Sequence, residues 1–134
     1  MDTNVLKRFA QEARIGLQNK VRTKIDLVLH EESAARRESP KAVRDLESKI
    51  RSTSKEKVIE QVAYTWFNRF TALQYMDMNG YNRVRVIAPS EGQTRPEILS
   101  EASAGSFEDA LISENTQNIV RSLLDGRSAS SDPD

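Results

Sequence analysis

The sequence predicts an all-α protein, a helical bundle built on two long helices with shorter helices beside them. Two long stretches carry apolar residues at helical spacing, and shorter stretches with the same spacing lie between and after them. Only one short segment alternates apolar and polar residues. The chain has 134 residues and no cysteine, so we expect a single core that needs no disulfide.

The first long helix is expected from about Thr3 to Leu29, with Asp2, Thr3 and Asn4 as candidates for its N-cap. Its apolar residues share an arc of roughly 80° on a helical wheel. They are Leu6, Ala10, Ala13, Leu17, Val21 and Val28. This stripe is wide enough to pack against another helix.

A highly charged stretch from His30 to Ser39 follows, which we expect to be a connection or a frayed helical end. Ser39 and Pro40 then form an N-cap followed by proline at the first helical position. A short helix from about Pro40 to Arg51 is predicted, and its apolar residues recur at helical spacing.

The second long helix is expected over about 25 residues, from just after Thr53 to Gly80, and its stretch from Val58 to Gly80 contains the only tryptophan. Thr53 and Glu56 form a capping-box pattern at its start, and Gly80 can adopt the left-handed conformation that ends a helix. One apolar face is formed by Ile59, Val62, Ala63, Trp66, Phe70 and Leu73. This pattern predicts that Trp66 and Phe70 are core residues rather than platforms that stack on bases.

The alternation after Gly80 indicates one short extended segment, Val84 to Ala88. A second capping-box pattern, Thr94 with Glu97, predicts a short helix from Pro96 to about Ala104.

The stretch from Phe107 to Ile112 is expected to form one or two further helical turns. A last helix is predicted from Glu114 or Asn115 to Leu124, ended by Gly126. The sequence therefore predicts a helical domain over residues 1–126. Residues 127–134 are predicted to be a disordered tail or an artificial end.

The net charge of zero conceals an asymmetry. Residues 1–60 carry 14 Lys and Arg against 10 Asp and Glu, while residues 61–134 carry 6 against 10. Such a difference indicates either nucleic acid at the basic end or docking between oppositely charged surfaces. The candidate DNA-binding residues are Lys7, Arg8, Arg14, Arg22, Arg36 and Arg37. The alternative is that these side chains are only a solvated surface.

Three further residues of the central helix are singled out. Phe67 and Tyr75 lie off the apolar face and are candidates for contact with another domain. Asp77 lies in line with the apolar face near the helix C-terminus, where a carboxylate is disfavoured. We therefore expect it to form a structural ion pair or to accept hydrogen bonds. The candidate donors are Arg69, Arg83 and Arg85.

Catalytic motifs are absent from the sequence. The five glycines form no cofactor loop and no two prolines are adjacent, and His30 is the sole histidine. We expect no catalytic, cofactor-binding or metal-binding residue, and we expect His30 to be solvated. No apolar run approaches the length of a membrane span, so a cytoplasmic protein that does not bind membranes is expected.

Three segments carry a resemblance to a known family. They are RFAQEARIGLQNKV (Arg8 to Val21), YTWFNRFTALQYMDMNGY (Tyr64 to Tyr81) and VRVIAPSEGQTRPEIL (Val84 to Leu99). Over residues 1 to about 125, the chain resembles the amino-terminal region of PglX, the adenine-specific DNA methyltransferase of BREX phage-defence systems.

The resemblance implies a parent enzyme that transfers a methyl group from S-adenosylmethionine to adenine N6. This chain lacks both the glycine-rich cofactor loop and the (Asn/Asp)-Pro-Pro-(Tyr/Phe) element that holds a flipped base. It would then be a helical domain that docks on the catalytic domain of the same polypeptide, on the backbone of double-stranded DNA, or on another BREX component. The alternative is a freestanding helical adaptor with no catalytic activity.

Overall fold

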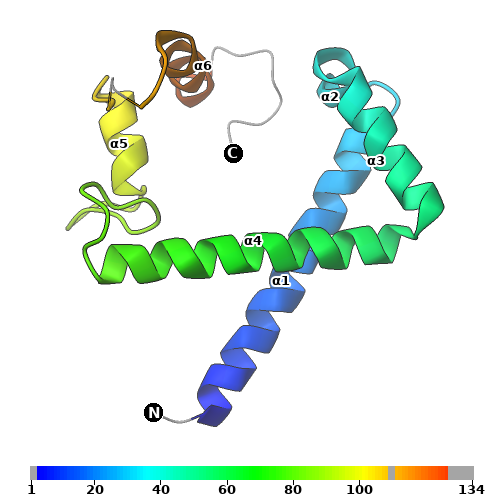
Figure 1. Cartoon of the computed structure of the whole chain (residues 1–134), viewed down its shortest axis with the longest axis horizontal. Coiled ribbons are helices and arrows are strands. Elements are labelled where there is room, and N and C mark those ends of the chain that lie inside the picture. The colour runs from blue at the N-terminus through cyan, green and yellow to red at the C-terminus, as the bar shows by residue number, and fades with distance from the viewer. Residues whose placement is uncertain (1–2, 109–110, 127–134) are drawn as a thin grey trace. The chain divides into compact units, whose positions relative to one another are not determined.

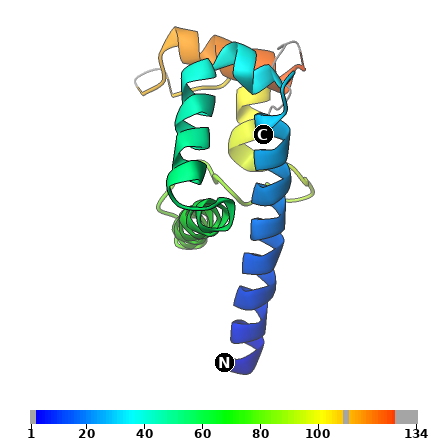
Figure 2. The same ribbon diagram turned by 90° about the vertical axis from the view of Figure 1, so that its right-hand side faces the viewer.

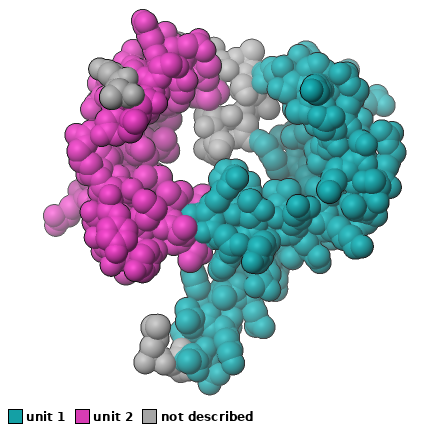
Figure 3. Space-filling model, viewed as in Figure 1, with its two compact units in different colours: residues 1–69 teal, residues 70–134 magenta. Residues whose placement is uncertain are grey.

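The fold is all-α, as the sequence predicts. The computed structural model describes residues 3–108 and 111–126, and in these ranges it contains six α-helices and no β-strand. The predicted tail, 127–134, lies outside the described residues, and so does the middle of the turn expected at 107–112. The chain divides into two compact units, residues 1–69 and residues 70–134 (Figure 3).

The first unit contains α1 (Thr3–Leu29), α2 (Ala34–Glu38), α3 (Pro40–Ser52) and the first part of α4 (Lys55–Met78). Figures 1 and 2 show α2 joining the end of α1 to the start of α3. The predicted bounds of α1 are confirmed, and the helix continues through Gly16 without interruption.

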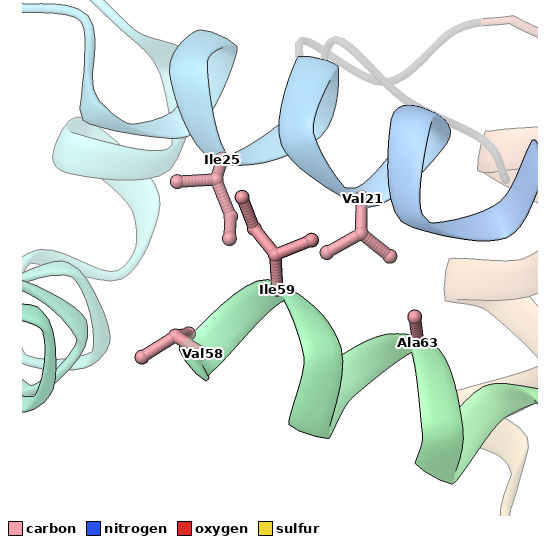
Figure 4. Close-up of a cluster of buried hydrophobic side chains, with 5 residues drawn as sticks. All are labelled: Val21, Ile25, Val58, Ile59 and Ala63. Carbon is pink, nitrogen blue, oxygen red and sulfur yellow. The ribbon is translucent and has the colours of Figure 1, made fainter. Parts of the chain in front are cut away.

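The core of the first unit forms where α1 meets the first turns of α4. Figure 4 shows Val21 and Ile25 of α1 facing Ile59 of α4, with Val58 and Ala63 beside it. Ile59 is only 1% exposed. Partly buried side chains pack around this cluster, and they are Leu17, Leu29, Leu46, Ile50 and Val62. Burial of these apolar groups is the main force that holds the unit together.

The predicted apolar face of α4 is buried at its first turns but exposed at Trp66 and Phe70. Ile59 and Ala63 are in the core, whereas Trp66 and Phe70 are each 43% exposed, so their assignment to the core was wrong. The reason is that the buried residues of α1, Val21 and Ile25, meet only the beginning of α4. The periodicity is still present further along, but within this chain it does not bury these two rings.

The predicted cap of α4 was also wrong by one residue. The hydroxyl oxygen of Ser54 accepts a 3.2 Å hydrogen bond from the backbone N–H of Lys57, as an N-cap does. The hydroxyl of Thr53 instead donates to the carbonyl oxygen of Lys49 at 2.8 Å, and Glu56 pairs with Arg22. The end of α3 thus takes the Thr53 hydroxyl, and Arg22 of α1, which lies far away in the sequence, takes Glu56.

The end of α4 follows the prediction. Gly80 has φ +65°, and the backbone N–H of Tyr81 bonds the carbonyl oxygen of Met76 at 3.0 Å, which together form a Schellman motif. A residue with a side chain is strained at this φ, because Cβ approaches its own carbonyl. Gly80 therefore fixes where the helix stops and the next loop begins.

The second unit contains the rest of α4, then α5 (Glu97–Ser103) and α6 (Glu114–Leu124). Ser113 caps α6 by accepting a hydrogen bond from the backbone N–H of Thr116. The N-cap of α5 is Pro96, so the capping box predicted from Thr94 and Glu97 does not form. The guanidinium of Arg121 in α6 lies 5.1 Å from the ring centre of Phe107.

Candidate interaction surfaces

Asp77, at the end of α4, holds the following loop against the helix. Asp77 is only 8% exposed. One of its carboxylate oxygens accepts hydrogen bonds from the backbone N–H of Val86 (2.9 Å) and from the side-chain amide of Asn82 (3.0 Å). The other oxygen accepts from the backbone N–H groups of Ile87 (2.7 Å) and Ala88 (3.0 Å). Four donors from one loop thus converge on a single side chain.

The same contacts control the protonation of Asp77. Burial by itself would raise the pKa of this carboxyl, but the hydrogen bonds from Val86, Asn82, Ile87 and Ala88 stabilise the charged form. The outcome is a pKa well below the usual value, so Asp77 is ionised at neutral pH. Asp77 thus accepts hydrogen bonds, which is one of the two roles expected from the sequence; the other was a structural ion pair.

The arginines expected to donate to Asp77 have other partners. The guanidinium of Arg69 lies 5.2 Å from the ring centre of Trp66, Arg83 pairs with Glu108 at 3.4 Å, and Arg85 pairs with Glu97 at 2.9 Å. The hydrogen bond from Arg85 also lowers the pKa of Glu97. Backbone donors replaced the expected side-chain donors because the loop turns its own N–H groups toward the helix end.

This arrangement explains why the predicted extended segment is not a strand. Residues 84–88 contain bends, and three of their N–H groups are directed to Asp77 rather than to a neighbouring strand. The only β-type pairing in the described ranges is an isolated bridge between Pro89 and Pro96. The alternation of apolar residues therefore does not mark a β-strand here, because Asp77 takes the backbone N–H groups that a strand would pair.

Most of the candidate DNA-binding residues make contacts within the chain. Arg8 pairs with Glu12 at 3.2 Å, Arg22 with Glu56 at 2.7 Å, and Arg37 donates to the carbonyl oxygen of Glu32. The first pair is highly exposed, so it contributes little to stability.

Lys7 and Arg14 differ from that group, because both are exposed on α1 and neither forms an ion pair with a described residue. The six candidates therefore differ in whether their charged groups already have a partner within the chain. They lie on α1 and α2, and four of them (Arg8, Arg22, Arg36 and Arg37) already form an ion pair or a hydrogen bond.

Arg36 has a structural position. Its guanidinium donates to the carbonyl oxygens of Leu29 (2.8 Å) and His30 (3.1 Å), which lie at the C-terminal end of α1, and to the carboxylate of Glu47 on α3 (2.6 Å). The last carbonyls of a helix lack partners within that helix and favour a nearby cation. Arg36 thus joins α1 to α3, a role that the sequence did not indicate.

Aromatic side chains are exposed in each unit. In the first unit, Tyr64 and Trp66 are exposed while Phe67 is half-buried. In the second unit, the exposed rings of Tyr75 and Tyr81 meet edge to face at 6.1 Å. Of the two residues expected to contact another domain, Tyr75 is thus open to solvent and Phe67 is partly covered.

The second unit also contains a pocket of about 510 Å³ that the sequence did not indicate. Its walls include Val84, Val86, Ile98, Leu99, Phe107, Ile112 and Val120, with Arg83 and Glu108 at the same site. The apolar residues of α5 and α6 are the signal that could have predicted it.

The described residues offer no group of three or more potential metal ligands. Within the same ranges, the helices lack the combination of length and apolar character that a bilayer span requires.

Comparisons with known proteins place these features in a larger context. Aligned over 158 positions, 93% of the chain is 28% identical to the adenine-specific methyltransferase PglX of Lacticaseibacillus casei (strain Zhang). Over 83 positions, 60% of the chain is 32% identical to the adenine-specific methyltransferase BrxX of Escherichia coli O9:H4 (strain HS). The predicted resemblance to PglX is confirmed.

The similarity to PglX and BrxX concerns a small part of those proteins. The chain spans 13% of the length of PglX and 7% of the length of BrxX. No family model matches the chain, and no solved structure matches it.

Proposed function

We propose that this chain acts as the helical amino-terminal domain of an adenine-specific (N6) DNA methyltransferase of a BREX phage-defence system. The supporting observation is the mismatch in coverage, since nearly the whole chain aligns with PglX but accounts for 13% of it. The sequence also has no glycine-rich loop for S-adenosylmethionine and no element that would hold a flipped adenine. In the parent enzyme, methyl transfer belongs to another region of the polypeptide.

The role proposed for this chain is docking on that catalytic region. Apolar side chains near the start of α1 support it, because Leu6 is 51% exposed and Val5 and Phe9 are exposed as well. Leu6 belongs to the predicted apolar stripe of α1, whose later member Val21 is buried in the core. Apolar rows that continue beyond the core are typical of surfaces covered by another domain. Trp66 and Tyr75 are further exposed rings that docking would cover.

The reading frame that encodes the chain gives a direct test. The proposal requires coding sequence past Asp134 with a glycine-rich cofactor loop and an Asn-Pro-Pro-Tyr-like element. The corresponding protein test mixes the chain with that catalytic region and measures co-elution by size exclusion. Replacing Leu6 and Phe9 with Asp should abolish co-elution, while replacing the exposed Lys57 with Asp should not. Separate elution of the unaltered chain would contradict docking.

The alternative function is a freestanding helical adaptor. It is favoured by the fact that the first unit has its own buried core, centred on Ile59, and so needs no other domain to bury that residue. A stop codon directly after Asp134, together with capture of a partner other than a methyltransferase, would support the adaptor over the enzyme domain.

A further inference from the structure

One helix face of the first unit carries cations that form no ion pair with any residue that the structure describes. Lys41, Arg44 and Arg51 lie along α3, with Ser48 between them, and all four residues are exposed. None of the three cations forms an ion pair or a side-chain hydrogen bond with another described residue. We call these four residues the α3 basic face. None of the four residues is among the DNA-binding candidates expected from the sequence.

The α3 basic face points away from the core. Val43 is 3% exposed, and Leu46 and Ile50 pack against the core cluster of α1 and α4. At about 100° per residue, the α3 basic face is centred roughly opposite these three residues on the helix. Packing within the unit therefore leaves the cations in solvent.

The nearest carboxylates do not neutralise this face. Glu47 stands four residues before Arg51, which is the ordinary spacing of a helical ion pair. Its carboxylate is instead bound to Arg36 at 2.6 Å, so it already has a cationic partner. Asp45 lies on the opposite flank and forms no ion pair with a described residue. Three positive charges against one flanking negative charge leave a net positive surface.

We propose that the α3 basic face binds the phosphate backbone of double-stranded DNA. The proposal rests on the proposed function, in which the parent enzyme acts on DNA. Lys41 and Arg51 are ten residues apart, which is about 15 Å along a helix. A DNA strand carries a phosphate every 3.4 Å or so of its axis, so three contacts fit this length.

The side-chain types suit phosphate as well as the spacing does. Two of the three cations are arginines, whose planar guanidinium binds a phosphate through two parallel hydrogen bonds. The hydroxyl of Ser48 is a further donor of the kind that contacts DNA phosphates. Such contacts position DNA without reading its sequence. The α3 basic face would therefore contribute affinity for DNA but no specificity for a particular site.

The inference places the DNA contact on α3 instead of on the residues expected from the sequence. Arg22 and Arg36 would have to leave Glu56 and Glu47 in order to reach a phosphate. The cations of the α3 basic face have no such contact to break. For the same number of phosphate bonds, the α3 basic face therefore costs less to engage.

The test compares two variants with the same change in net charge. One replaces Lys41, Arg44 and Arg51 with Gln, and the control replaces Lys7, Arg14 and Lys20 of α1 with Gln. All six residues are exposed. Gln is about as good a helix former as Lys or Arg, and circular dichroism would verify that both variants keep their helices.

Binding to a mixed-sequence DNA duplex is measured by fluorescence anisotropy between 50 and 200 mM salt. Three phosphate contacts predict that the unaltered chain loses about 40-fold in affinity over this range. The α3 variant should bind more weakly at 50 mM salt and lose most of its salt dependence, since each lost contact lowers the slope by about one. The control variant should keep most of the affinity at 50 mM salt and most of the salt dependence.

Equal losses of DNA affinity in the two variants would overturn the proposal, because binding would then depend on the net charge of the chain and not on the α3 basic face. Failure of the unaltered chain to bind DNA, with binding of an acidic polypeptide such as polyglutamate through α3, would overturn it too. Co-elution with the catalytic region tests the proposed function separately. An α3 variant that still co-elutes, with a DNA affinity equal to that of the unaltered chain, would refute only the inference about α3.

Discussion

A carboxylate oxygen of Asp77 accepts a 2.7 Å hydrogen bond from the backbone N–H of Ile87, ten residues later in the chain. The contact folds the loop after α4 back onto the end of that helix. Val86 and Ala88 donate to the same carboxylate, so three consecutive N–H groups depend on one side chain. A loop whose donors are satisfied in this way does not need a partner strand.

Replacement of Asp77 with Asn should destabilise the second unit. An amide has one acceptor oxygen, and its NH₂ group would face backbone N–H groups that also need an acceptor. We expect the melting temperature to fall by several degrees, with faster amide exchange at Val86, Ile87 and Ala88. The exposed Gln74, replaced with Asn, serves as a control. Unchanged exchange at these amides would show that Asp77 does not hold the loop.

The contribution of Asp77 should depend on pH. Because its pKa is lower in the folded protein than in the unfolded chain, protonation favours unfolding. The stabilisation is complete above the unfolded pKa of about 3.9 and is lost as the pH falls toward the folded pKa. Urea unfolding of the unaltered protein and of the Asp77→Asn variant should therefore differ most above about pH 5 and converge in acid. A constant difference from pH 6 to pH 2 would contradict this assignment.

Replacement of Ile59 with Ala should have a large effect on the first unit. Ile59 is fully buried between α1 and α4, so its truncation leaves a cavity and costs about 2–5 kcal/mol of unfolding free energy. The matched change of the exposed Met78 to Ala should cost less than about 0.5 kcal/mol. Urea unfolding measured by circular dichroism gives both values. Similar losses in the two variants would mean that the core does not lie at this crossing.

Replacement of Arg36 with Gln tests the junction of α1 and α3. The change removes donors from the carbonyl oxygens of Leu29 and His30 and from Glu47, for an expected loss of about 1–3 kcal/mol. The neighbouring Arg37, replaced with Gln, loses one exposed hydrogen bond and should change the stability by less than about 0.5 kcal/mol. If both variants unfold alike, Arg36 is not the link between these helices.

Trp66 provides a built-in probe of docking, since it is the only tryptophan and is 43% exposed. Acrylamide should quench its fluorescence readily in the isolated chain. Addition of the catalytic region of the parent enzyme should shift the emission to shorter wavelength and reduce the quenching, because burial removes water from the indole. Co-elution without any change in quenching would place the docking surface away from Trp66.

Local sequence signals determined most of the helices of this protein, although α2 lies in a stretch expected to be a connection or a frayed end. The bounds of α1 and the end of α4 at Gly80 depend on caps, apolar spacing and a left-handed glycine, all of which act within a few residues. The sequence also identified Asp77 as a carboxylate that needs a partner, since an acid on the apolar face near a helix C-terminus is unfavourable.

Only the tertiary structure decided which groups meet. It exposed Trp66, gave Asp77 backbone donors instead of arginines, and joined Glu47 to Arg36, which left Arg51 in solvent. These outcomes depend on contacts between residues distant in sequence, whereas helical periodicity describes only which residues share a face. A face becomes core or surface according to what packs against it, and α1 covers only the beginning of α4.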